Sequence, residues 1–258
     1  MRVSMQNTLG WYSARVIPSP WNVVAHIGFE ALGYLAAALL YVRLKRRGDV
    51  IASPARASLV AAACVGAALG SRLLTLLEDP ARVHWRDVLM LDAGKTIIGG
   101  ILGAWLAVEW VKRRTGVTER TGDLFVYPLA LGTCIGRVGC FLAGLSDGTV
   151  GRATTLPLGV NFGDGVMRHP LPLYEIAGVV LIVVVLRSVP VGRNGDLFRL
   201  YVFGYMGLRF ALEFLKETPR FGGFTTLQWA ALAGMVACSG ALVRVFRREE
   251  VRVAEAAC

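Results

Sequence analysis

The stretch CIGRVGCFLAGLSDGTVG, from Cys134 to Gly151, begins apolar, contains one arginine, Arg137, and ends in a segment rich in glycine. A charge at bilayer depth costs at least about 2.5–3.5 kcal/mol on insertion scales, so such a residue faces a partner or a water-filled cavity. Whether Arg137 lies at that depth depends on whether the residues around it form a membrane helix, and the rest of the chain bears on that question.

The composition indicates an integral membrane protein. Of the 258 residues 55% are hydrophobic, and the mean hydropathy of +0.54 is above the usual range of soluble proteins. The net charge of +10 lies in short clusters between apolar runs, which favours loops at a membrane face and no nucleic-acid partner. The five cysteines lack zinc or CxxC spacing, and four of them lie in or beside apolar segments, so we expect those four to be buried thiols and expect no metal site. Residues 1–20 lack the long apolar region of a signal peptide.

Seven segments are apolar over about the 20 residues that a spanning helix needs. They are residues 22–42, 56–76, 89–111, 124–143, 171–188, 198–215 and 225–245. Of the 28 Lys and Arg, 16 follow the odd-numbered segments and eight lie on the opposite face. The positive-inside rule therefore predicts an N-terminus outside and a cytoplasmic C-terminus. We expect an all-α protein with a single transmembrane domain over residues 1–258, ending in a short basic cytoplasmic tail, residues 246–258.

Four basic residues lie within the predicted spans: Arg72, Lys95, Arg137 and Arg209. Acidic residues occur in the same segments and can pair with them: Glu30, Asp92, Glu175 and Glu213. Pairing between helices, or snorkelling to an interface, explains Lys95 and Arg72 as well as a functional role does.

The predicted orientation brings several polar groups to the outer half of the bilayer. Arg209 and Glu213 lie one helical turn apart and share a face, with Tyr205 one turn earlier. The fifth span begins from the outside after His169, with Tyr174 and Glu175 just inside it. We expect these groups to gather with Arg137, where forked hydrogen bonds from two guanidinium groups suit a lipid phosphate. The small residues of IIGGILGA, Ile97 to Ala104, fit either close helix packing or a lipid-facing groove.

At this point the motifs resemble a known family. GRVGCFLAG is similar to the signature of the bacterial prolipoprotein diacylglyceryl transferases, which is close to GRxGNFxNGE. Other segments resemble family motifs in the same order: LGSRL around Arg72 resembles LGxRxxY, LDAGKTIIGGILGA resembles DGGMSxHGGxxGA, RHPLPLYE resembles RHPSQLYE, GYMGLRFALEFLK resembles GxGxxRxxxExxR, and TTLQW resembles xMGQ. The resemblance covers about residues 20–245.

The resemblance implies an enzyme of the bacterial plasma (inner) membrane. Such enzymes move the diacylglyceryl group of phosphatidylglycerol onto the lipobox cysteine thiol of a secreted preprolipoprotein, at its signal peptide, and need no cofactor. By position, Arg137 and Arg209 match family arginines and are expected to act on the phosphate. The resemblance further implies substrate binding by residues at or near matching motif positions, namely Tyr205, Glu213, Gly151, Arg72, Tyr174 and Glu175.

The chain departs from the family motifs where protons are handled. Ile98 stands at the position of the family histidine, and Cys140 stands at the first asparagine of the signature. Lys95, expected three residues earlier on the same helical face, and His169 are the candidate bases. His169 fits equally well as a capping or interface histidine beside Pro170.

Three functions therefore stay open from the sequence. The first is the diacylglyceryl transfer itself, with thiol deprotonation taken over by His169, by Lys95 or by the field of Arg137 and Arg209. The second is transfer of a lipid-derived group to another acceptor on the same fold. The third is a membrane protein that binds a phospholipid headgroup without catalysis. We favour the first, because both arginines are retained.

Overall fold

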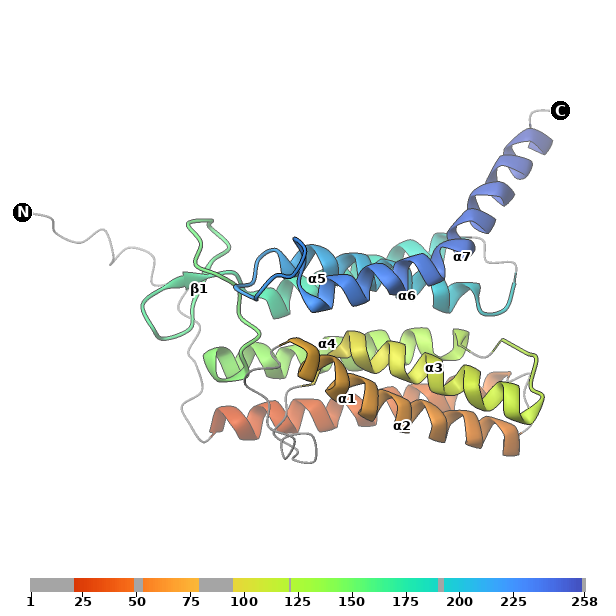
Figure 1. Ribbon diagram of the computed structural model, residues 1–258, viewed down its shortest axis with the longest axis horizontal. Helices are drawn as coiled ribbons and strands as arrows, with labels where there is room; N and C mark the ends of the chain where they lie inside the picture. Colours follow the sequence, from red (N-terminus) through yellow and green to blue (C-terminus); the bar gives the residue numbers. More distant parts are fainter. Residues whose placement is uncertain (1–20, 49–52, 79–94, 121, 190–192, 257–258) are drawn as a thin grey trace, which may run out of the picture.

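The computed structural model describes residues 21–48, 53–78, 95–120, 122–189 and 193–256. Within them lie seven α-helices, one for each apolar segment predicted from the sequence, and all run roughly along the long axis of the molecule (Figure 1). They are α1 Trp21–Arg47, α2 Ser53–Glu78, α3 Ile97–Thr115, α4 Val126–Ala143, α5 Leu171–Ser188, α6 Asp196–Glu213 and α7 Thr226–Ala256. Residues 1–20, Asp92 and the predicted start of the third span, residues 89–94, lie outside the described residues.

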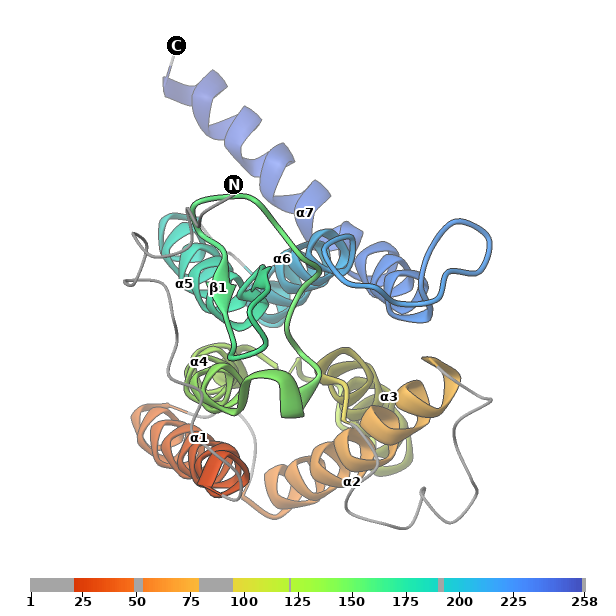
Figure 2. The same cartoon turned by 90° about the vertical axis from the view of Figure 1, so that its left-hand side faces the viewer.

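Short elements connect the helices at two places. The 3-10 helix η2, Asp123–Phe125, leads into α4, and η3, Gly144–Asp147, follows it. Before α5, the strands β1 Val160–Asn161 and β2 Met167–Arg168 form an antiparallel hairpin. Seen from the hairpin end, α5, α6 and α7 lie on one side of the bundle, and α1, α4, α2 and α3 lie on the other (Figure 2).

The protein is an all-α, multi-pass membrane protein. Five helical segments in the described residues are long and apolar enough to cross a bilayer: α1, α2, the run from η2 through α4 to η3, α5, and α7 as far as Arg247. Large apolar side chains point outward along the bundle, with Leu106 73% and Val236 74% exposed. A bilayer removes the cost of exposing them to water. The remaining helices, α3 and α6, are at least as long as α5 but contain more charged residues, and seven complete spans stay a prediction.

Basic residues mark one end of the bundle. The last turns of α1 and α3 each carry three, and that of α5 carries Arg187. All three turns lie at the end opposite the β1–β2 hairpin (Figure 1). The first, third and fifth helices therefore end with basic residues at the same end of the bundle, as the charge count predicts. At the same end α7 continues as helix to Ala256, so the predicted tail, residues 246–258, is helical over most of its length.

Small residues bring α2 and α3 into direct backbone contact. A Cβ added at Gly66 would lie 2.4 Å from the carbonyl oxygen of Gly103, and one at Gly99 would lie 2.3 Å from that of Gly70. Side chains would force the helices apart at both positions. Of the two interpretations of Ile97–Ala104, the fold supports close helix packing.

Helix α6 lies at the centre of the core, where Val202, Tyr205 and Met206 are fully buried. It lacks a side-chain cap of its own at Gly195. The carboxylate of Asp123, in η2, accepts hydrogen bonds from the backbone amides of Gly195 at 2.6 Å and Phe198 at 2.9 Å. A residue that precedes α4 therefore satisfies the first turn of α6, as an N-cap residue does.

Candidate functional site

A buried carboxylate, that of Glu175 on α5, joins two arginines from two other helices. Its Oε2 lies 2.9 Å from Nε of Arg137 on α4 and accepts a hydrogen bond from Nη1 of Arg209 on α6 at 2.8 Å. Its Oε1 accepts a hydrogen bond from the Tyr205 hydroxyl at 2.7 Å. The side chain of Glu175 is 1% exposed, and those of Arg137 and Arg209 are 10% exposed. The predicted gathering of these four residues is thus present in the structure.

Helix geometry explains how the side chains reach one another. Arg209 and Glu213 lie one turn apart on α6, with Nη2 of Arg209 4.0 Å from Oε2 of Glu213. Pro172 in the first turn of α5 needs no amide partner there, and it places Glu175 in the next turn, inside the bundle. Arg137 lies near the middle of α4 and turns toward α5. Each group therefore sits on a rigid helix instead of a loop.

The site retains buried hydrogen-bonding capacity that is unused. Nε of Arg137 lies close to Glu175 but is poorly aligned to donate to it, and within the described residues it has no hydrogen-bond acceptor. Nε of Arg209 and Oε1 of Glu213 are likewise buried without partners there. Buried polar atoms are nearly always satisfied in folded proteins, so such a set calls for a ligand or water. Two free guanidinium donors in one buried place fit an anion with several oxygens.

Gly151, His169 and Tyr174 form a second group beside the start of α5. The amide of Gly151 donates to the carbonyl of His169 at 2.9 Å, and a Cβ at Gly151 would lie only 2.7 Å from the Cβ of His169. The Nδ1 atom of His169 lies 3.3 Å from the hydroxyl of Tyr174. Burial lowers the pKa of His169 and the nearby charge of Arg152 lowers it further, so the ring is neutral at pH 7 and able to accept a proton. Gly151 is required here for close packing.

Lys95 does not lie where the sequence predicts it. Helix α3 begins at Ile97, because Thr96 is its N-cap and its hydroxyl accepts a hydrogen bond from the amide of Gly99 at 3.3 Å. Lys95 therefore precedes the helix and shares no helical face with Ile98, which is 1% exposed in the core. Its ammonium pairs with Glu30 of α1 at 3.0 Å and its side chain is 49% exposed. The ion pair considered for Lys95 in the sequence is therefore present, but it joins α1 to the segment that precedes α3. Arg72 lies on α2 and is half-buried.

The cysteines differ from the predicted uniform burial. Cys140 and Cys238 are buried and Cys134 is half-buried, but Cys64 lies on the outer surface of α2. Its helix is apolar all round, and apolar helix faces are exposed where they meet lipid. Cys140 lies one turn after Arg137, whose Nη1 donates to its sulfur at 3.5 Å.

Lys216 is a polar group at this site that reasoning from the sequence missed. It was counted among the loop charges, yet it is half-buried just beyond α6. Burial lowers the pKa of its ammonium, Arg209 lowers it further, and Glu213 and Glu78 act in the opposite direction. Its place at the end of GYMGLRFALEFLK, where the family motif ends in arginine, was the signal that could have identified it.

Comparisons with known proteins agree with these motifs. The family model described as prolipoprotein diacylglyceryl transferase matches residues 21–244. A phosphatidylglycerol–prolipoprotein diacylglyceryl transferase of Clostridium tetani is 32% identical over 205 residues, covering 74% of this chain and 79% of that protein. The proteins of the same name from Cupriavidus necator and Methylocella silvestris are 32% identical over 205 residues and 30% identical over 254 residues. The match to the Methylocella silvestris protein covers 91% of this chain and 92% of that protein. The match to the Cupriavidus necator protein covers 72% of this chain and 73% of that protein.

Proposed function

This chain belongs to the prolipoprotein diacylglyceryl transferase family, and we propose that it transfers the diacylglyceryl group of phosphatidylglycerol to the lipobox cysteine of a preprolipoprotein. The names of its relatives describe this reaction. The observation in the molecule that carries the proposal is the pair of buried guanidinium groups from α4 and α6 with donors to spare. A phosphodiester within the bilayer is the anion that such a buried pair suits.

In the proposed reaction the substrate thiolate attacks the glycerol carbon that bears the phosphate. A carbon–sulfur bond forms, the carbon–oxygen bond breaks, and its electron pair leaves on the phosphate oxygen of glycerol phosphate. Arg137 and Arg209 hold the phosphate and stabilise the charge that develops on the leaving oxygen. Their fixed positions in a site of low dielectric make this stabilisation larger than it is in water.

Glu175 has a separate role in this proposal. Without a phosphate present, its carboxylate bridges the two guanidinium groups, offsets one of their two positive charges and holds them within reach of one another. The hydroxyl of Tyr205 holds the carboxylate in turn. Phosphate binding then uses donors that Glu175 leaves free, and the arginines need little rearrangement. Such preorganisation lowers the cost of stabilising a transition state.

We further propose that the chain lies in the bacterial plasma (inner) membrane, with the β1–β2 hairpin and the site at its outer side. The charge distribution at the two ends of the bundle supports this orientation. The bilayer then supplies phosphatidylglycerol, and the signal peptide of a secreted preprolipoprotein arrives at the same leaflet. Gly151, Tyr174 and Glu213 remain candidate substrate-binding residues in this arrangement, and Arg72 remains one on α2.

The test uses full-length protein in micelles that contain phosphatidylglycerol, with a lipobox peptide, and measures the mass of the peptide. We expect the mass of a diacylglyceryl group to be added at the cysteine, and Arg137→Ala and Arg209→Ala to abolish the addition. Arg113→Ala, at an exposed position at the opposite end of the bundle, is the matched control and should retain activity. An unmodified peptide, together with headgroup binding that both arginine variants lose, would instead indicate a lipid-binding protein. Modification of a different acceptor would indicate a related transferase.

A further inference from the structure

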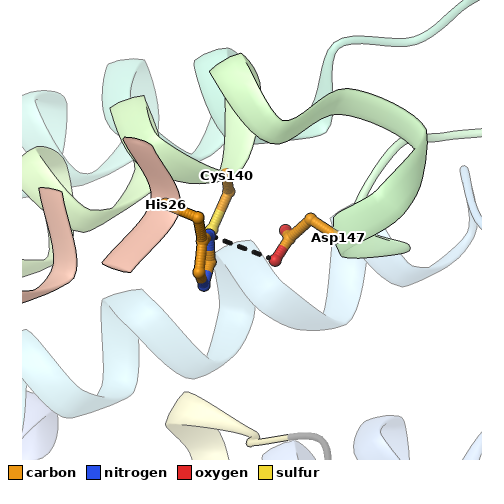
Figure 3. Close-up of side chains that lie close together, drawn as sticks. All are labelled: His26, Cys140 and Asp147. Carbon is orange, nitrogen blue, oxygen red and sulfur yellow. Dashed lines mark ion pairs between the residues drawn. The ribbon is translucent and has the colours of Figure 1, made fainter. Parts of the chain in front are cut away.

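Three potential metal ligands meet at the hairpin end of α1 and α4. The ligand atoms of His26, Cys140 and Asp147 all lie within 4.8 Å of one another (Figure 3). Nδ1 of His26 lies 3.4 Å from Oδ1 of Asp147. Bonds of about 2.0–2.3 Å to a tetrahedral zinc ion place its ligand atoms roughly 3.3–3.8 Å apart. The His26–Asp147 separation already matches this spacing, and the sulfur needs only a small approach.

Close packing of α1 against α4 brings the three residues together. Helices α1 and α4 approach so closely at Gly139 that a Cβ there would lie 2.7 Å from the Cβ of Phe29 and 3.2 Å from the carbonyl oxygen of His26. Cys140 follows this contact, and its sulfur lies within 4.8 Å of a ring nitrogen of His26 on α1. After α4, η3 turns the chain back, and the carboxylate of Asp147 points toward His26 from beside Cys140 (Figure 3).

Neighbouring hydrogen bonds hold the group in place. Nδ2 of Asn22, one turn before His26 on α1, donates to Oγ of Ser146 at 2.9 Å, and Ser146 donates to the carbonyl of Ala143 at 2.9 Å. The Thr149 hydroxyl donates to Oδ2 of Asp147, which leaves Oδ1 directed at His26. Metal ligands are commonly oriented by partners of this kind.

The donor set suits zinc. A thiolate, an imidazole and a carboxylate are the three ligand types that bind Zn²⁺ in proteins, and three protein ligands leave the fourth tetrahedral position open. Nδ1 of His26 is buried, and within the described residues it makes no hydrogen bond. A thiolate and a carboxylate together balance the charge of Zn²⁺. The complex would therefore be neutral and compatible with the Arg137 guanidinium 3.5 Å from the sulfur.

We propose that His26, Cys140 and Asp147 bind Zn²⁺ and that its open position receives the thiol of the acceptor cysteine. This inference rests on the proposed transfer, to which it adds the group that activates the nucleophile. A thiol that binds a metal ion does so as thiolate. Cys140 also contacts Arg137, so the sulfur of an acceptor cysteine bound to the same zinc ion would lie near the arginine that holds the phosphate.

The metal would account for deprotonation of the acceptor thiol, which Ile98 cannot perform. The acceptor thiol gives its proton to solvent as the sulfur binds Zn²⁺, and the metal-bound sulfur then forms the bond to the glycerol carbon. The carbon–oxygen bond breaks with its electron pair on the phosphate oxygen, at Arg137 and Arg209. No base on α3 is needed and nothing is oxidised or reduced. The thioether product is a weaker ligand than the thiolate, so it leaves the metal.

Cobalt titration tests the site independently of transfer. Full-length protein is stripped of metal with a chelator in detergent and titrated with Co²⁺, which replaces zinc and absorbs visible light. We expect one equivalent to bind per chain with a sulfur-to-cobalt charge-transfer band. Cys140→Ser should lose the band, and Cys64→Ser, at the exposed thiol of α2, should keep it. Thr149→Val should weaken binding about 10–100-fold, because it removes only a supporting partner of Asp147, and Asp147→Asn, which replaces a ligand, should weaken binding more than that.

Addition of peptide then tests the open position. A lipobox peptide with cysteine should intensify the charge-transfer band, and the same peptide with serine should not. Absence of the band in the unsubstituted protein, or an identical band in Cys140→Ser, would overturn the metal site. Full transfer activity of the metal-free protein would overturn the role of the metal in activating the thiol, and in that case the proposed function would stand. Cobalt and peptide binding without any gain in peptide mass would overturn the proposed transfer and leave the metal site intact.

Discussion

Replacing Glu175 with glutamine should separate the two effects of this residue, on stability and on anion binding. Glutamine keeps the volume of the side chain and one carbonyl oxygen, but it removes the negative charge between Arg137 and Arg209. Its amide nitrogen can only donate, and both neighbours are donors as well. We expect the variant to be much less stable and to bind glycerol phosphate more tightly, since the negative charge that repels an anion at this site is gone.

The magnitude follows from the burial of the group. Glu175 is 1% exposed and its two ion pairs are at 2.9 Å and 2.8 Å, so the change leaves uncompensated charge inside the protein. Removing one partner of a buried pair costs about 3–5 kcal/mol. Tyr205→Phe removes only the hydrogen bond to Oε1, for which about 1.5–3 kcal/mol is expected. The structure therefore predicts an order of destabilisation as well as a size.

The assay is unfolding in detergent, followed by circular dichroism, with headgroup affinity measured by calorimetry. Asp164→Asn is the matched control, because it removes a carboxylate paired with Arg168 in the hairpin where water reaches both groups. We expect the loss of stability to be largest for Glu175→Gln, intermediate for Tyr205→Phe and negligible for Asp164→Asn. If Glu175→Gln is as stable as Asp164→Asn, the arginines are solvated by water and the argument from a dry ion-pair cluster is wrong.

Three further predictions concern the structure around the site. Gly151→Ala should lower the melting temperature, since the added carbon meets His169 at 2.7 Å, whereas Gly136→Ala, with nothing within 4 Å in α4, should gain about 0.5–1 kcal/mol. Asp123→Ala should cost about 0.5–2 kcal/mol by removing the cap of α6, which chemical unfolding of the variant would measure. The pKa of His169 is lowered by burial and by Arg152, so protonation favours the unfolded chain and stability should fall as the pH drops through about 6.5. His169→Asn should flatten that dependence in a melting series from pH 8 to about 5.

The helices were predictable because each depends on one local property. A run of about 20 apolar residues has few alternatives to a helix in a bilayer, where every backbone polar group must be satisfied within the chain. Boundaries followed the same logic except at the end of α7, which continues to Ala256 beyond the predicted residue 245, and at the start of α3. There the hydroxyl of Thr96 caps the helix and sets its start at Ile97, a detail that hydropathy does not contain. The error for Lys95 follows from that one residue.

The site was predictable only in part. Spacing along α6 placed Tyr205, Arg209 and Glu213 on one face, and the structure agrees. That Glu175 would pair with both arginines depends on the packing of α4 and α6 against α5, and no periodicity in a single helix determines it.

The group of His26, Cys140 and Asp147 was missed for the same reason. The spacing of the cysteines along the chain gives no sign of it, because His26 belongs to the first helix and Asp147 to a 3-10 turn beyond the fourth. Only the close approach of α1 and α4 at Gly139 brings them together.

The cap that Asp123 places on α6 has a consequence for the height of the site in the membrane. Arg209 lies 13 residues beyond Asp196, about 20 Å along a helix that rises 1.5 Å per residue. Axial slippage of α6 by a single residue would move its guanidinium by half of the 2.8 Å that separates it from Glu175. The carboxylate of Asp123, at the start of α6, thus fixes the axial position of the helix and of Arg209 on it. The position of Arg209 in the proposed phosphate site is therefore set at the opposite end of α6, about 20 Å away.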